Sequence, residues 1–129
     1  MIKLTAPDGS PVKIDGKKVM RARRRISGES SKASTRIDWV MMSLVREPID
    51  EVAQLIRAEQ DSFTALTSRD GSKIWFNAEK VEGPISLTPS QSDGVVKSSI
   101  KLMSYRQFVT EDDAKVRSVI KKAGGTPLP

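Results

Sequence analysis

The sequence contains no cysteine and no histidine among its 129 residues. The absence of cysteine excludes disulfide bonds, thiolate nucleophiles and zinc sites built on sulfur. Without histidine there is no Ser-His-Asp triad, no imidazole metal ligand, and no side chain whose unperturbed pKa lies near neutrality. Any catalysis would depend on carboxylates, lysines or the backbone, so we expect a protein that is not an enzyme and that has no cofactor and no metal site.

Phosphate-binding loops and long apolar runs are also missing. No G-x-G-x-x-G or G-x-x-x-x-G-K-[ST] pattern can be drawn, and no stretch approaches the roughly 18 apolar residues that a transmembrane helix needs. The first residues, Met1 to Thr5, lack the basic and apolar regions of a secretory signal peptide. We therefore expect a cytoplasmic protein without membrane association.

What the sequence does contain is an internal repeat. The segment LTAPDGSPVKIDGKKV (4–19) aligns without a gap with LTSRDGSKIWFNAEKV (66–81). After a further shift of two residues, VREPIDEVAQLI (45–56) aligns with VTEDDAKVRSVI (109–120). Similarity at both ends of a unit of about 62 residues, in the same order, indicates a duplicated half-domain and not a solenoid array.

Each copy opens with the signal of a β-hairpin. Asp8-Gly9 and Asp70-Gly71 lie between short runs of alternating apolar residues, and glycine adopts the positive φ of a tight turn without strain. A third strand is expected to start near Val19 in the first copy and near Val81 in the second. A polar loop rich in serine and glycine follows in both copies.

Each copy closes with an apolar segment and a helix. Residues 35–45 and 95–109 carry apolar side chains on both faces, which predicts either one long bent strand or two strands joined by a tight turn. Apolar residues at helical spacing predict a helix after Pro48 in the first copy and another after Thr110 in the second.

The sequence thus predicts an α+β fold of two pseudo-symmetric, hairpin-rich halves. We expect the first repeat unit to span residues 1–60, the second to span 61–124, and residues 125–129 to form a flexible tail. A unit of about 60 residues buries only some 60% of the surface of its unfolded chain, so it is marginally stable alone. The two halves are therefore expected to share one core.

The same pattern resembles a known family. The residues from Ile2 to Val19 around the Asp8-Gly9 turn, followed by Val45-Arg46-Glu47 and Asp50-Glu51-Val52 at a helix start, resemble the small FlbD-type proteins found with bacterial flagellar genes. That family usually has a second N-G or D-G hairpin before the helix, whereas WVMMSLV (39–45) contains no such turn. The resemblance implies a non-catalytic cytoplasmic accessory protein with a link to motility.

The largest difference between the copies follows Val19. The first copy reads MRARRRIS (20–27), and the second reads EGPISLTP (82–89). If residues 19–26 form a strand, Arg21, Arg23 and Arg25 project from one face at a pitch of roughly 6.6 Å, which is close to the phosphate spacing of a nucleic-acid strand. The corresponding positions of the second copy are uncharged, so we expect that the fold does not require these arginines.

The arginines belong to the one dense basic segment of a chain whose net charge is +6. The candidate nucleic-acid-binding or anion-binding residues are Lys17, Lys18, Arg21, Arg23, Arg24 and Arg25. They indicate a solvated edge strand whose cations prevent aggregation, a nucleic acid or other polyanion as partner, or an acidic protein as partner. The chain has six aromatic residues and no evident base-stacking surface, so any nucleic-acid binding is expected to be phosphate-driven and strongly salt-dependent.

Trp75 is the second difference between the copies, because the matching position of the first copy is Lys13. We expect this tryptophan either to be covered by the other half or by the tail, or to be exposed as an anchor of a protein interface. Together these features favour a non-catalytic interaction or regulatory protein of unknown partner. The alternative is a nucleic-acid-binding protein that uses the basic strand.

Overall fold

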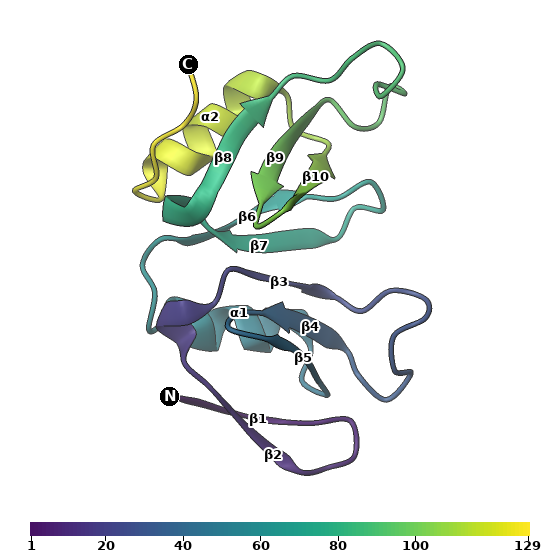
Figure 1. Cartoon of the computed structure of the whole chain (residues 1–129), viewed down its shortest axis with the longest axis vertical. Helices are drawn as coiled ribbons and strands as arrows, with labels where there is room; N and C mark the ends of the chain where they lie inside the picture. Colours follow the sequence, from purple (N-terminus) through teal and green to yellow (C-terminus); the bar gives the residue numbers. More distant parts are fainter. The chain divides into compact units, whose positions relative to one another are not determined.

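The computed structural model describes residues 1–129 and divides into two compact units, Met1–Asp61 and Ser62–Pro129. Both units combine antiparallel strands with one closing helix, as the predicted α+β class requires (Figure 1). The division lies one residue beyond the predicted boundary between residues 60 and 61. Neither helix has the length and apolar character that crossing a bilayer requires.

The two units have the same order of elements. The first contains β1 (Ile2–Thr5), β2 (Pro11–Ile14), the 3-10 turn η1 (Gly16–Lys18), β3 (Arg21–Arg24), β4 (Thr35–Asp38), β5 (Met42–Val45) and α1 (Ile49–Arg57). The second contains β6 (Phe63–Thr67), β7 (Lys73–Asn77), η2 (Ala78–Lys80), β8 (Val81–Ile85), β9 (Ser98–Leu102), β10 (Tyr105–Val109) and α2 (Asp113–Lys122).

The first two strands of each unit form the predicted antiparallel hairpin, β1–β2 in one and β6–β7 in the other. In both turns the aspartate side chain accepts a hydrogen bond of 2.9 Å from the backbone N–H of the following serine, Ser10 or Ser72. The turn glycines have φ of +91° at Gly9 and +88° at Gly71, which is the left-handed region that glycine adopts without a steric penalty.

The third strand of the first unit is shorter than expected. A strand over residues 19–26 was predicted, but the chain forms η1 first and β3 runs only from Arg21 to Arg24. The Asp15 side chain accepts a hydrogen bond from the Lys17 N–H and so caps the 3-10 turn that precedes the strand. Asn77 caps η2 in the same way, through the N–H of Glu79.

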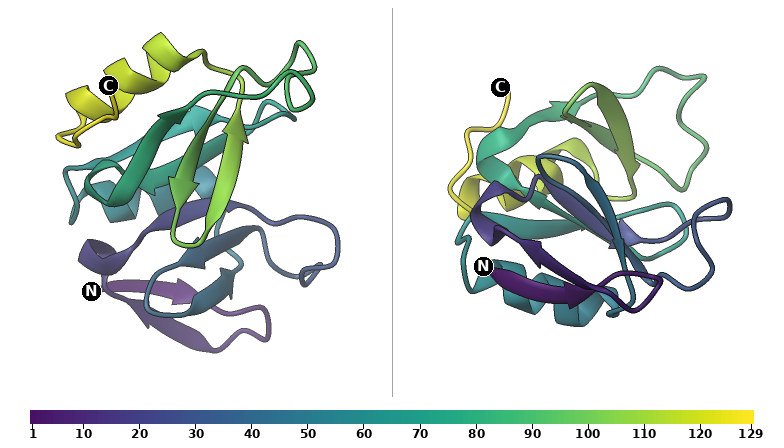
Figure 2. Two further views of the ribbon diagram at one scale, coloured as in Figure 1. Left: turned by 45° about the horizontal axis from the view of Figure 1, so that its top comes forward. Right: turned by 60° about the horizontal axis from the view of Figure 1, so that its bottom comes forward.

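The apolar segment before each helix forms two strands joined by a tight turn, which was one of the two predicted alternatives. In the first unit β3, β4 and β5 form an antiparallel meander, and in the second unit β8, β9 and β10 do the same. A hairpin thus precedes α1 although the sequence there has neither glycine nor asparagine. Figure 2 shows both meanders from two further directions.

Each unit has its own set of buried apolar side chains. In the first unit they are Ile2, Leu4, Ile14, Val19, Ala22, Ala33, Ile37, Val45, Val52, Ala53 and Ile56. In the second unit a contiguous core joins Leu66, Phe76, Ala78, Val81, Ile100, Leu102, Val109, Val116 and Ile120. Both helices therefore bury one apolar stripe against the strands of their own unit.

Residues 125–129, expected as a flexible tail, are hydrogen-bonded to the second unit. Gly124 has a φ of +94° and reverses the chain after α2. The Gly125 N–H then donates to the Ile120 carbonyl at 2.9 Å, and the Leu128 N–H donates to the Gly83 carbonyl at 2.6 Å. The helix cap thus directs the segment back along α2 and β8 (Figure 1), and the flexibility of residues 125–129 stays a prediction.

Candidate functional site

Arg21, at the start of β3, is buried and paired. Asp38 lies directly opposite it on β4, and its Oδ2 atom accepts hydrogen bonds from Arg21 Nε at 2.9 Å and from Nη2 at 2.8 Å. The strand pairing itself sets this contact, because register brings the two side chains together on one face. Arg21 therefore has a carboxylate partner within its own unit.

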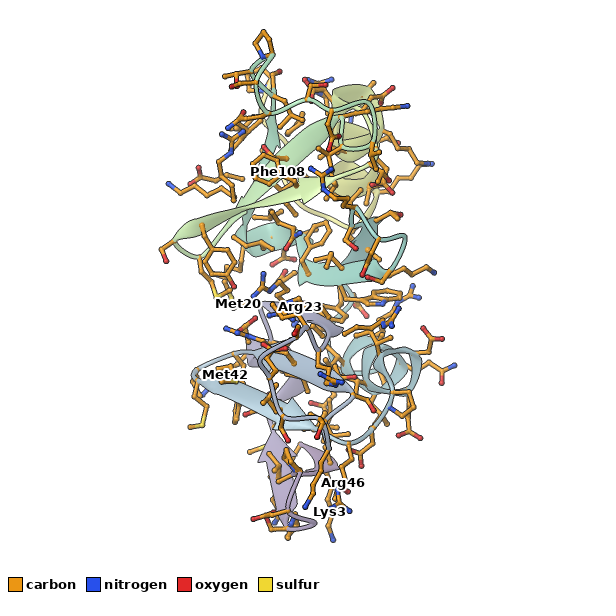
Figure 3. All side chains as sticks on the ribbon, turned by 90° about the vertical axis from the view of Figure 1, so that its right-hand side faces the viewer. Lys3, Met20, Arg23, Met42, Arg46 and Phe108 are labelled. Carbon is orange, nitrogen blue, oxygen red and sulfur yellow. The ribbon has the colours of Figure 1, made fainter.

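Arg23 is paired as well, with a carboxylate from the loop between β3 and β4. Its Nη1 and Nη2 atoms donate to Glu29 Oε1 and Oε2 at 3.2 and 3.0 Å, which is the bidentate geometry favoured by a guanidinium and a carboxylate. Arg36 lies opposite Arg23 in the strand register and binds Glu29 Oε2 at 3.2 Å and Asp38 Oδ1 at 3.1 Å. Figure 3 labels Arg23 within this group.

These five residues form one connected ion-pair network of three arginines and two carboxylates, and we call it the arginine network. Burial by itself would raise the pKa of Glu29. Hydrogen bonds from Arg23, from the Ile26 N–H and from Arg36 outweigh that effect and lower the pKa to about 2. Glu29 is thus ionised at neutral pH, and its charge holds Arg23 and Arg36 close together in spite of their mutual repulsion.

Two of the cations that were expected to form a phosphate-spaced row belong to the arginine network, and anion binding by this segment stays a prediction. Arg21 and Arg23 are buried and ion-paired. Arg25 lies beyond the end of β3 and is half-buried, and its Nη1 atom donates to the Ile26 carbonyl at 3.4 Å. Sequence reasoning missed the pairing because Glu29 and Asp38 lie in other segments. The remaining candidates, Lys17, Lys18 and Arg24, are exposed to solvent.

The turn between β4 and β5, together with the first residue of β5, exposes three consecutive apolar side chains. Val40, Met41 and Met42 have 62%, 60% and 52% of their surfaces exposed, and the Met42 side chain extends outward from the ribbon (Figure 3). We call Val40–Met42 the apolar tip. The sequence contains the run V-M-M at this turn, where glycine, asparagine or aspartate is usual. Because the ends of β4 and β5 were not known from the sequence, this run was interpreted as part of a buried segment.

The base of the apolar tip is held by several polar contacts. The Trp39 N–H donates to the Met41 carbonyl at 3.0 Å, and the Trp39 indole Nε1 donates to Ser43 Oγ at 3.0 Å. Asp38, directly opposite Met42 in the register, is a member of the arginine network and also accepts a hydrogen bond at its carbonyl from the Met20 N–H at 2.8 Å. The apolar tip is therefore a short turn whose flanking residues are held by hydrogen bonds and ion pairs.

Trp75, the candidate interface anchor, packs against other side chains of the second unit. Its ring stacks on Phe63 with centroids 5.8 Å apart, and the Lys73 ammonium lies 5.5 Å from its centroid in a cation–π arrangement. The residue is half-buried. These contacts give Trp75 a structural role within β6–β7, and its use as an interface anchor stays a prediction.

The conspicuous acids have structural partners. Glu47 accepts hydrogen bonds from the Thr5 N–H and hydroxyl, both at 2.9 Å, and Glu111 binds Thr67 in the same way at 2.9 and 2.8 Å. Asp112 caps α2 by accepting from the Lys115 N–H at 2.8 Å. No group of three or more acidic residues is arranged to hold a metal ion.

No protein-family model, curated protein or solved structure matches this chain. The resemblance to FlbD-type proteins therefore stays a prediction. In the structure, β4 and β5 form a hairpin before α1, although the sequence there contains no N-G or D-G turn.

Proposed function

We propose that this protein is a non-catalytic interaction protein that docks onto a partner protein through the apolar tip. The observation that carries the proposal is the exposure of Val40, Met41 and Met42, each more than half accessible to solvent on one turn. Contiguous exposed apolar side chains mark interaction sites more often than isolated ones do. Methionine suits such a surface because its flexible, polarisable side chain adapts to the shape of the partner.

Burial of the apolar tip contributes to the free energy of binding. Full burial of a valine or methionine side chain contributes on the order of 1.5–3 kcal/mol. Because the three side chains expose 52–62% of their surfaces, complete burial of the tip supplies roughly 3–5 kcal/mol, before the entropic cost of association is subtracted. A micromolar affinity of about 8 kcal/mol therefore needs further contacts around the tip. The fixed base reduces the entropic cost, because Trp39 and Asp38 already hold the turn in place.

The charge of the first unit indicates the character of the partner. Lys17, Lys18 and Arg24 are exposed, and complementary charge accelerates association with an acidic surface. An acidic protein with an apolar pocket fits these features best. The nucleic-acid alternative loses Arg21 and Arg23 to the arginine network, which removes two of its six proposed contacts.

The proposal includes a regulatory role in the cytoplasm, and the resemblance to FlbD-type proteins suggests flagellar gene products as the first partners to test. Such a role needs no catalytic residues.

Affinity capture from an extract of the native host with three baits tests this function. The baits are the natural chain, a triple variant with Val40→Ser, Met41→Ser and Met42→Ser, and a control variant with Val95→Ser, which alters an exposed apolar residue of the second unit. We expect one protein to bind the natural chain and the control, to resist nuclease, and to be lost by the triple variant. Equal capture by all three baits, or capture abolished by nuclease, would refute the proposal.

A further inference from the structure

The outer strand of the second meander has an irregular stretch. β8 is the terminal strand of the sheet β10–β9–β8, and its pairing with β9 is interrupted between Glu82 and Ile85. The Gly83 carbonyl in this gap accepts its hydrogen bond from the Leu128 N–H of the tail, at 2.6 Å. The tail therefore supplies to β8 a main-chain contact that a neighbouring strand would otherwise make.

The other side of the same tail residue is held by α2. The Arg117 Nε atom donates to the Leu128 carbonyl at 3.3 Å, so both backbone groups of Leu128 have partners, one on β8 and one on α2. Gly125 brings the tail close enough, since a Cβ atom there would lie 2.1 Å from the Ala78 carbonyl oxygen. β8 and α2 thus form the two sides of a binding site for one extended residue.

The sequence of residues 126–129 is suited to such a binding site. Pro127 and Pro129 have no N–H and favour the extended polyproline conformation, so Leu128 provides the one main-chain donor between them. A segment of this kind loses little conformational entropy when it binds. Leu128 stays 39% exposed, so the second unit covers this residue only in part.

We propose that the Gly83 edge of β8 and Arg117 form a docking site for an extended peptide that has an apolar residue between two prolines. The chain's own residues 126–129 occupy this site and compete with a peptide from outside. A tethered segment competes at an effective concentration in the millimolar range, so release of the tail is needed for tight binding of a second peptide. This site lies in the second unit and is independent of the apolar tip.

The test uses a fluorescein-labelled peptide with the sequence of residues 124–129, Gly-Gly-Thr-Pro-Leu-Pro, and measures its anisotropy with full-length variants. Leu128→Pro removes the donor and frees the tail, whereas the control Leu128→Ala keeps it. We expect the Leu128→Pro chain to bind the peptide at least tenfold more tightly than the natural chain does, and the Leu128→Ala chain to stay within about threefold of the natural one. A peptide with proline in place of leucine is expected not to bind.

Two further measurements keep the outcome interpretable. The thermal unfolding curve of each variant verifies that the second unit is folded. The backbone amide NMR shifts of Val81, Glu82, Gly83 and Ile85 verify where the peptide binds. Adding Arg117→Gln to the Leu128→Pro chain is expected to weaken peptide binding several-fold. A folded Leu128→Pro chain that fails to bind millimolar peptide, or that binds it no better than the natural chain, overturns the proposal.

Discussion

Replacing Glu29 by glutamine is predicted to destabilise the first unit strongly at neutral pH. Burial would raise the pKa of Glu29, but the hydrogen bonds from Arg23, the Ile26 N–H and Arg36 lower it from 4.5 to about 2. A shift of that size corresponds to about 3 kcal/mol. Only 12% of the side chain is exposed, so solvent screens the interaction little. Glutamine keeps the shape but leaves Arg23 and Arg36 without the charge that offsets their repulsion.

The stabilisation by Glu29 is expected to depend on pH. Because the pKa of Glu29 is lower in the folded state, the stabilisation is complete above the unfolded value of 4.5 and is lost as pH falls toward 2. We expect the free energy of unfolding of Glu29→Gln to lie about 3 kcal/mol below that of the natural chain at pH 7. The difference is expected to shrink below pH 4.5 and to close near pH 2.

Urea unfolding followed by tryptophan fluorescence measures the free energy of unfolding of the first unit. The chain has two tryptophans, and Trp75→Phe leaves Trp39 as the reporter of the first unit. Glu51→Gln is the matched control, since that carboxylate is exposed on the first turn of α1 and is worth no more than about 1 kcal/mol. A difference at pH 7 no larger than that of the control, or one that persists unchanged at pH 2, would refute the account of the arginine network.

Two further predictions concern turns and carboxylate contacts. Met103→Gly is expected to raise the free energy of unfolding of the second unit by about 1 kcal/mol, because Met103 has a φ of +54° and glycine adopts that conformation without strain. Thermal unfolding measures this change, and a lowered midpoint would show that the methionine side chain stabilises more than its backbone costs. Glu47→Gln and Glu111→Gln are each expected to cost about 1–3 kcal/mol in their own units, as recorded by the tryptophan of each unit, because both carboxylates accept two hydrogen bonds from a threonine. A loss in only one unit would contradict the equivalence of the two contacts.

The sequence was sufficient where a local signal determines the structure. The hairpins at Asp8-Gly9 and Asp70-Gly71 depend on a glycine with positive φ and on an aspartate that bonds the next serine, and both conditions are visible in neighbouring residues. The closing helices were equally accessible, since apolar spacing identifies the stripe that they bury. Local chemistry of this kind leaves few competing conformations.

The sequence was insufficient where two distant segments determine the outcome. The turn at Val40–Met42 has none of the usual turn residues, and it forms because β4 and β5 pair on either side of it. The arginines of β3 were interpreted as free cations because Glu29 and Asp38 come from the following loop and strand. Charge pairing across a sheet depends on register, and register is known only when the strand ends are known.

The arginine network also changes what the comparison of the two copies means. Uncharged residues at the matching positions of the second copy suggested that Arg21 and Arg23 are dispensable, yet both are buried in ion pairs. The partner positions differ as well: Asp38 ends β4, whereas β9 ends with the buried apolar residue Leu102.

A complete ion-pair group can be exchanged for apolar residues at little cost, whereas loss of one member leaves a buried charge without its counterion and costs about 3–5 kcal/mol. At the positions compared, the first unit therefore has charged partners and the second has uncharged residues, and each set is consistent within its own unit. A residue that differs between the two units can therefore be replaced without loss of stability only when its partners are replaced with it. The second unit has Leu102 where the first has Asp38, but a single substitution of Asp38 is expected to lower stability strongly, because it leaves Arg21 and Arg36 without this counterion.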